Sequence, residues 1–168
     1  MAPPLYLLLL QLLATLSLSS AQTESPTGTQ IGLGFSLSTT QIGHNKSFWL
    51  SPSGSFSFFF YPLSDPQNFI VGIWMPKTPE KTLVWSANRD SPPLSNGSSI
   101  ILASNGVLLL RNSEAQEKPI SDNPEPASSA ALLDNGNLVL HNSQSMTIWQ
   151  SFDSPTDTIL SGQVLLPG

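Results

Sequence analysis

One short element recurs three times in this chain of 168 residues. Each copy has a small polar residue, then a glycine, then large apolar residues at alternate positions; the copies are Ser53–Phe58, Asn105–Leu110 and Asn135–Leu140. The glycine supplies the positive φ of a tight turn, and the alternation turns one side of the following strand toward a core. The core pairs predicted in this way are Phe56 with Phe58, Leu108 with Leu110, and Leu138 with Leu140. Three copies of one hairpin predict three similar sheets packed about a common axis.

The rest of the chain has short apolar runs separated by turn-forming residues, and no stretch has a convincing helical period. The runs are Ile31–Leu37, Phe48–Leu50, Phe56–Tyr61, Phe69–Trp74, Thr82–Trp85, Ser99–Leu102, Val107–Leu110, Ala130–Leu133, Leu138–Leu140 and Thr147–Trp149. The 15 prolines also disfavour helix interiors. The pattern predicts an all-β protein: an antiparallel sandwich, barrel or prism. Trp74, Trp85 and Trp149 each end a run, and we expect them in the core.

The first 21 residues have the composition of a secretory signal peptide. Leu7–Leu18 is apolar, and Ser19–Ala21 places small side chains at the −3 and −1 positions of a cleavage site. The apolar stretch is shorter than the roughly 20 residues of a membrane span. We therefore predict a secreted, extracellular chain with a flexible lead-in at residues 22–30, one domain at 31–155 and a C-terminal extension at 156–168.

Charge and residue content argue against several classes of function. The formal net charge is −5, with six Lys and Arg against eleven Asp and Glu, whereas nucleic acids and anionic membranes attract clustered positive charge. The chain has no cysteine and only His44 and His141, so no disulfide and no metal or other cofactor is expected. Neither a nucleophile elbow nor a pair of catalytic carboxylates is evident, and we predict no enzymatic activity.

Four segments together resemble the bulb-type (monocot mannose-binding) lectin domain, in the version found in plant G-type lectin S-receptor-like serine/threonine kinases. They are Val71–Trp74, Leu83–Pro92, Leu132–Leu140 and Trp149–Thr158. The resemblance implies a type II β-prism of three four-stranded antiparallel sheets, location in the apoplast and mannose-type glycans or a glycoprotein as partners. Family members commonly dimerise by exchanging C-terminal strands, so a homodimer is possible. In the related receptors the chain continues into a second lectin-like unit, of which residues 156–168 would be the start.

The family's sugar site is a strand motif, Gln-x-Asp-x-Asn-x-Val-x-Tyr. Aligned on the third repeat, it falls on Leu133, Asn135, Asn137, Val139 and His141, and only Asn137 and Val139 match. Leu133 cannot form the hydrogen bonds of the glutamine, and Asn135 loses a charge-assisted bond, about twice as strong as a neutral one. The second and first repeats preserve even less; their positions are Ala103, Asn105, Val107, Leu109 and Arg111, and Ser51, Ser53, Ser55, Ser57 and Phe59. We expect a degenerate site, with Asn135, Asn137, Val139 and His141 as candidate sugar contacts.

Other polar segments have structural interpretations. Asn88–Asp90 is expected to form a turn in which Arg89 binds nearby carbonyls or a carboxylate. Asn45 and Asn96 begin N-glycosylation sequons. Residues 114–118 and 122–126 are predicted to be a solvated hairpin loop.

Two functions remain open at this point. The first is a secreted lectin that recognises glycans or glycoproteins with a degenerate mannose site. The second is a protein-interaction module, a truncated or decoy receptor-type ectodomain that does not bind sugar. The identities of residues 133, 135 and 141 distinguish the two.

Overall fold

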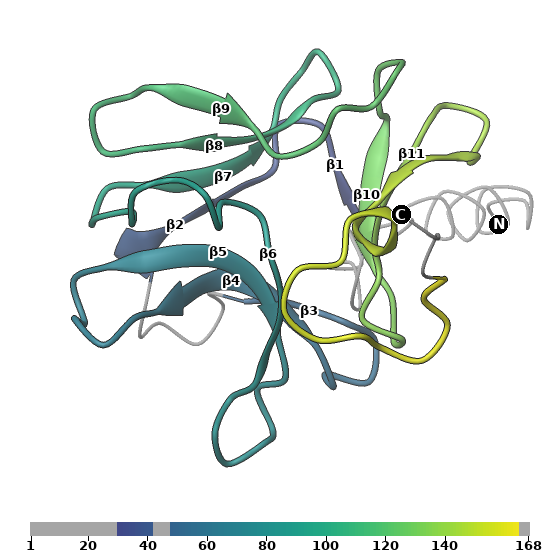
Figure 1. The fold of residues 1–168 in the computed structure, drawn as a ribbon. Helices are drawn as coiled ribbons and strands as arrows, with labels where there is room; N and C mark the ends of the chain where they lie inside the picture. Colours follow the sequence, from purple (N-terminus) through teal and green to yellow (C-terminus); the bar gives the residue numbers. More distant parts are fainter. Residues whose placement is uncertain (1–29, 42–47, 165–168) are drawn as a thin grey trace, which may run out of the picture.

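The computed structural model describes residues 30–41 and 48–164, which form three four-stranded antiparallel sheets around a common interior (Figure 1). Sheet A has the order β1-β10-β11-β12, sheet B the order β2-β7-β8-β9 and sheet C the order β3-β4-β5-β6. The strands are β1 Gln30–Gly32, β2 Ser36–Ser38, β3 Trp49–Leu50, β4 Ser57–Pro62, β5 Phe69–Trp74, β6 Leu83–Ser86, β7 Ser99–Leu102, β8 Leu108–Arg111, β9 Glu117–Pro119, β10 Ser129–Leu132, β11 Leu138–His141 and β12 Thr147–Gln150. Two short 3-10 helices are η1 Thr39–Gln41 and η2 Ser151–Asp153. The predicted all-β class and the three similar sheets are confirmed.

The three repeats occupy equivalent places. Their glycines, Gly54, Gly106 and Gly136, have φ of 65°, 77° and 85°, and each turn precedes the second strand of a consecutive hairpin. A Cβ at Gly136 would lie 2.5 Å from Leu160 Cδ1 and 2.9 Å from Phe56 Cε1. The positive φ therefore favours glycine there, and any larger residue would also require the Leu160 and Phe56 side chains to shift.

The apolar residues that follow these glycines form the core. All six predicted core residues are buried in one cluster, and Phe58, Leu108, Leu138 and Leu140 have no exposed surface. Their strands pair in register with the neighbouring strand, as in Leu140 opposite Ala130 and Leu110 opposite Ile100. Each sheet therefore presents one apolar face to the other two, which removes that surface from water.

The apolar run Ile31–Leu37 is divided between two sheets. Its first part, β1, pairs with β10 of sheet A, and its second part, β2, pairs with β7 of sheet B. Leu33 and Gly34 form the turn between them, and Ile31 and Leu37 both reach the core. The segment thus links two sheets, and Gln30, expected in the lead-in, is the first residue of β1.

The tryptophans are divided between two faces. Trp85 and Trp149 lie toward the interior, with ring centroids 6.1 Å apart, as expected. Trp74 is buried but faces outward from sheet C, where it packs edge-on against Phe48 and Tyr61. The expected burial of Trp74 is confirmed, but on the outer face of sheet C, because it lies opposite Ser57, on the other face from Phe58 and Ile73.

Strand β9 was not expected, because its residues were placed in a solvated loop. Glu117, Lys118 and Pro119 are all exposed, yet they pair with Arg111, Leu110 and Leu109 of β8. An edge strand with no buried side chain has no apolar alternation to reveal it. Residues 122–126 contain no strand, as predicted.

The turns of the first and third repeats contact each other. Asp134 Oδ1 accepts hydrogen bonds from the Ser53 backbone N–H at 2.9 Å and from Ser53 Oγ at 2.7 Å. These bonds lower the pKa of the Asp134 carboxyl below its ordinary value, because they favour the charged form. The bond from the Ser53 backbone N–H has the largest effect. Both bonds link sheet A to sheet C at one end of the prism.

The repeats allow a direct test of the core. Replacing Leu138, which is fully buried, with alanine should lower the free energy of unfolding by about 3 kcal/mol. Leu133→Ala is the matched control, because Leu133 is 37% exposed, and it should cost less than about 1 kcal/mol. Urea denaturation measures both, and equal losses would contradict the assignment of the core face.

The Asp134–Ser53 contact predicts a pH dependence. A carboxyl with a lowered pKa in the folded state contributes stability above its unfolded pKa and loses it as the pH falls through the folded value. Asp134→Asn should therefore lower the melting temperature at pH 7, and the difference from the unmodified chain should close below the ordinary carboxyl pKa. If Ser53→Ala lowers the melting temperature of the Asp134→Asn variant as much as that of the unmodified chain, the two side chains are not energetically coupled and the prediction is refuted.

Candidate functional site

The outward face of sheet A is rich in polar side chains. Because alternate residues of a strand point to opposite faces, the strand partners of Val139 and His141 share their outward side. The residues of this sheet A face are Gln30, Ser129, Ala131, Val139, His141, Thr147 and Gln150. Gln30 Nε2 donates to Ser129 Oγ at 2.9 Å, and Ala131 and Val139 are buried at the centre. The face combines hydrogen-bonding groups with a buried apolar centre.

The predicted sugar contacts fall in different settings. Leu133 and Asn135 lie in the turn that precedes β11, so the alternation of a strand does not apply to them. Asn135 is exposed, and its Oδ1 accepts the Asn137 backbone N–H at 3.0 Å. Val139 is 3% exposed, while His141 is half-buried at the end of β11. The structure brings Val139 and His141 onto one face and leaves Asn135 at the adjoining turn.

Asn137 is engaged in bonds within the protein. Its side chain, on a residue 5% exposed, accepts from Ser151 Oγ and the Phe152 backbone N–H, both at 3.2 Å. Its Nδ2 donates to Gln150 Oε1 at 2.9 Å. Asn137 therefore fastens β11 to the end of β12 and to η2. A ligand could reach its amide only at the expense of these contacts.

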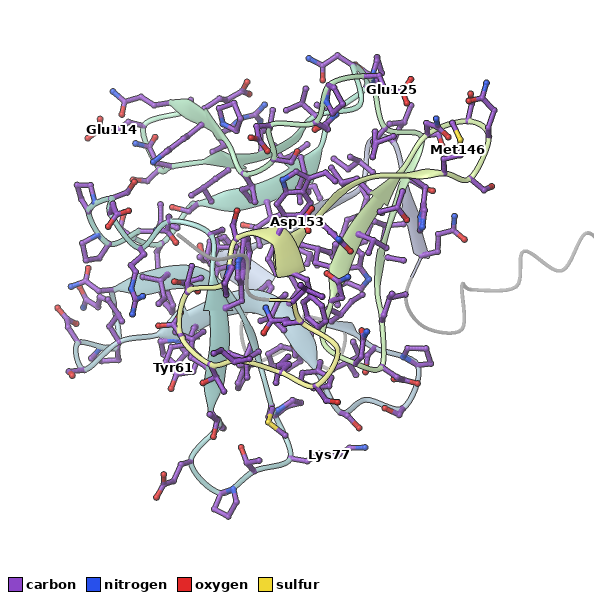
Figure 2. The ribbon with its side chains drawn as sticks, turned by 45° about the vertical axis from the view of Figure 1, so that its right-hand side comes forward. Tyr61, Lys77, Glu114, Glu125, Met146 and Asp153 are labelled. Carbon is purple, nitrogen blue, oxygen red and sulfur yellow. The ribbon has the colours of Figure 1, made fainter. Side chains whose placement is uncertain are left out.

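Gln150 and Asp153 are the residues that the sequence motif did not indicate. Gln150 Nε2 donates to Asp153 Oδ1 at 2.8 Å, which extends the contact from Asn137 into a chain of three side chains. Asp153 is exposed on the short η2 helix beside sheet A, whereas Lys77, Glu114 and Glu125 project from outer loops (Figure 2). An asparagine, a glutamine and an aspartate thus meet at one edge of the sheet A face. The signal for them was the segment Trp149–Thr158, which supported the family resemblance but was not connected with the site.

The equivalent positions of the other two repeats carry structural contacts. Arg111 pairs with Glu117, with Nε and Oε1 3.0 Å apart, and Leu109 is buried. In the first repeat, Phe59 is 1% exposed and packs edge-on against Phe48. These two outer faces resemble a saccharide site less than the sheet A face does.

In the turn at Asn88–Asp90, Arg89 binds a carboxylate and a carbonyl, as predicted. Arg89 donates through Nη2 to Asp157 Oδ1 at 2.9 Å and through Nη1 to the Thr156 carbonyl. The Thr158 backbone N–H also donates to the Val84 carbonyl at 3.1 Å. The first residues of the expected C-terminal extension therefore pack on the strand β6.

The remaining sequence predictions concern modification and targeting. Asn96 is exposed in the turn before β7, a position accessible to a glycan. Asn45, the signal segment at 1–21 and most of the lead-in at 22–30 lie outside the described residues. Within the described ranges, no helix has the length and apolarity to cross a membrane, and no group of three or more metal-ligating side chains occurs.

Comparison with known proteins shows what this chain is similar to. A family model described as D-mannose binding lectin matches residues 82–166, about half of the chain. The G-type lectin S-receptor-like serine/threonine-protein kinase LECRK4 of Oryza sativa subsp. indica is 42% identical over 175 aligned residues, covering 100% of this chain and 21% of the kinase. Receptor-like serine/threonine-protein kinase SD1-7 of Arabidopsis thaliana is 35% identical, covering 71% of this chain and 14% of that protein. The chain thus spans about a fifth of the rice relative. A solved structure, the Japanese Marasmius oreades lectin, matches 75% of this chain and 92% of its own with a TM-score of 0.49 and 14% identity.

The exposed sequon gives a testable prediction. When the chain is expressed through a plant secretory pathway, Asn96 should carry an N-glycan. Asn96→Gln should then remove one glycan from the intact mass, whereas Asn105→Gln should leave the glycan number unchanged because Asn105-Gly106-Val107 is not a sequon. Detection of Asn96 only in its unmodified form in the secreted protein would contradict the prediction.

Proposed function

Because this chain belongs to the bulb-type, D-mannose-binding lectin family, we propose that it recognises glycans or glycoproteins through the sheet A face. The observation that carries the proposal is the chain of side chains from Asn137 through Gln150 to Asp153. It offers an amide pair and a carboxylate beside Val139 and His141. Mannose-type glycans are the proposed ligands.

The chemistry of this face suits hydroxyl groups. A carboxylate can accept about four hydrogen bonds, and Asp153 is exposed with one oxygen engaged by Gln150. Hydrogen bonds to its charge are about twice as strong as neutral ones. His141, which is half-buried, can donate or accept a hydrogen bond, whereas Val139 is 3% exposed and offers little surface to a sugar. Gln150 and Asp153 would supply, from β12 and η2, the functional groups that Leu133 and Asn135 lack.

The same contacts predict weak binding. Asn137 is held by Ser151 and Phe152, and Leu133 offers no hydrogen bond. Each missing bond costs about 1 kcal/mol, and a dissociation constant of 1 mM corresponds to only about 4 kcal/mol. Binding of a single mannose should therefore lie in the millimolar range, and several sugars presented together should be needed for tight retention.

A protein partner is the second candidate function, and one observation favours it. Leu133 and Met146, in the turns that flank β11, are 37% and 56% exposed. Exposed apolar side chains beside a polar face occur at protein-interaction surfaces. In this case the chain would be a receptor-type ectodomain module whose sugar site has degenerated.

We also propose that the protein acts outside the cell. The apolar segment Leu7–Leu18 followed by Ser19–Ala21 supports export and cleavage after Ala21. The exposed sequon at Asn96 suits a chain that passes through the secretory pathway. The relatives are named as receptor-like kinases, and that activity is stated of them and not of this chain.

Substitutions on the sheet A face test the proposal. Asp153→Asn and Gln150→Ala should each weaken binding of methyl α-mannoside about five- to tenfold, since each removes about 1 kcal/mol of hydrogen bonding. The double change Leu133→Gln with Asn135→Asp should strengthen binding by restoring the motif side chains. Isothermal titration and a glycan array measure these effects.

The matched control is Asp65→Asn, a carboxylate on the β4–β5 loop of sheet C, which should leave binding unchanged. If the folded, unmodified chain retains no mannose-type glycan above background while the double change confers retention, the protein-interaction function is favoured instead. Retention that survives both Asp153→Asn and Gln150→Ala would place the sugar elsewhere.

A further inference from the structure

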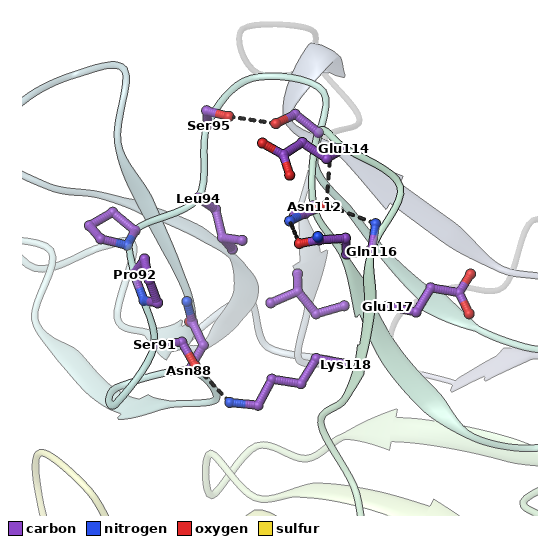
Figure 3. Close-up of a pocket in the computed structure, with 13 residues that line it drawn as sticks. Asn88, Ser91, Pro92, Leu94, Ser95, Asn112, Glu114, Gln116, Glu117 and Lys118 are labelled. Carbon is purple, nitrogen blue, oxygen red and sulfur yellow. Dashed lines mark hydrogen bonds between the residues drawn. The ribbon is translucent and has the colours of Figure 1, made fainter.

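A groove of about 520 Å³ lies between sheets B and C, away from the sheet A face. One wall is the segment after β6, residues 91–95, and the other is the β8–β9 hairpin (Figure 3). Leu94 and Leu110, both buried, give it an apolar floor. Its volume is within the range of about 300–1,000 Å³ that is typical of small-molecule sites.

Two hydrogen bonds between exposed side chains link the walls of this groove. Lys118 Nζ donates to Ser91 Oγ at 2.6 Å, and the hydroxyls of Ser95 and Ser113 lie 2.9 Å apart. Both bonds join the segment after β6 to the β8–β9 hairpin, and both are visible in Figure 3.

Asn88 places an unused donor at this groove. The residue is 3% exposed, and its Oδ1 accepts the Val71 backbone N–H at 2.8 Å. Its Nδ2 has no hydrogen-bond partner among the described residues. The other two such atoms, Ser57 Oγ and Trp74 Nε1, are not among the groove's lining residues. A buried donor without a partner is unfavourable, and an acceptor oxygen from the groove would satisfy it once a small movement of the lining side chains uncovers it.

A second hollow of about 330 Å³ adjoins the first, and Asn88 and Lys118 line both. Trp149, which is half-buried, also lines the second hollow. Indole rings offer a flat apolar surface with a polar N–H edge. The two hollows together provide room for more than one ring, with an indole at one end and a polar groove at the other.

We propose that this inter-sheet groove is a second binding site, which takes a short, neutral saccharide with an oxygen accepting from Asn88 Nδ2. Hydroxyls both donate and accept, and the groove offers both partners: Lys118 and Asn88 donate, while the carboxylate of Glu114 and the amide of Gln116 accept. The mixture of charges disfavours an anion, and the apolar floor suits the carbon skeleton of a sugar ring. The site is independent of the sheet A face and does not require binding there.

Amide spectra of the labelled full-length chain can test this site. Titration with mannobiose and with maltose should shift the Asn88 side-chain NH₂ signal together with the backbone amides of Leu94 and Lys118, in a saturable manner. Glycerol at the same hydroxyl concentration should not reproduce the shifts. If the three groups stay unmoved by either disaccharide, or move equally with glycerol, the donor is satisfied by water only and the proposal is overturned.

Variants make the test specific. Asn88→Asp keeps the acceptor for the Val71 N–H but replaces the free donor with an acceptor, and should weaken disaccharide binding in the groove about tenfold. Gln116→Ala, on the exposed hairpin, should weaken disaccharide binding about threefold. This variant tests the site even if Asn88→Asp fails to fold. Gln67→Ala, an exposed glutamine on the β4–β5 loop, is the matched control and should change nothing. Unchanged binding in Gln116→Ala and in folded Asn88→Asp would refute the site.

The same titration separates the two sites. Signals of His141 and Gln150 report on the sheet A face, and Asp153→Asn should weaken only those shifts. Shifts confined to the groove would support this second site while refuting the proposed function. Shifts confined to the sheet A face would support the proposed function and refute this second site.

Discussion

Mutual burial of three apolar sheet faces is the interaction on which the rest of this structure depends. The chain has no cysteine, so no disulfide supports the domain, and each sheet removes its inner face from water only by packing against the other two. Phe58, Leu110 and Leu140 mark equivalent inner positions of the three repeats, and all are buried. Loss of any one sheet would expose the inner faces of the other two.

This arrangement assigns the outer faces and the gaps between sheets to other roles. The outer face of sheet C is filled by aromatic rings, with Phe48 and Trp74 5.7 Å apart between centroids. The face of sheet A keeps polar side chains around Val139. The edge between sheets B and C carries the groove at Asn88. Three copies of one hairpin have thus diverged on the sides that do not form the core, where the packing constraint is weakest.

The turns show how the copies are held in relation to one another. Asp134 reaches Ser53 of another repeat, and the segment after Trp149 returns to sheet C through Arg89 and Asp157. Exposed ion pairs contribute little individually. The position of Thr156 and Thr158 on β6 also depends on backbone groups. These contacts connect η2, which carries Asp153, with both sheet A and sheet C.

Local sequence was sufficient for the β class, for the three glycine turns and for the inner face of each repeat, because period-two alternation and positive-φ glycines are properties of neighbouring residues. It was also sufficient for the family resemblance, which the matched relatives bear out. Tertiary structure alone divided the run 31–37 between two sheets, turned Trp74 outward and paired the exposed strand β9. It alone joined Asn137 to Gln150 and Asp153, and left Asn88 Nδ2 without a hydrogen-bond partner among the described residues. Those outcomes depend on which distant segments lie side by side, and hydrogen-bond partners 13 or more residues apart leave no periodic trace in the sequence.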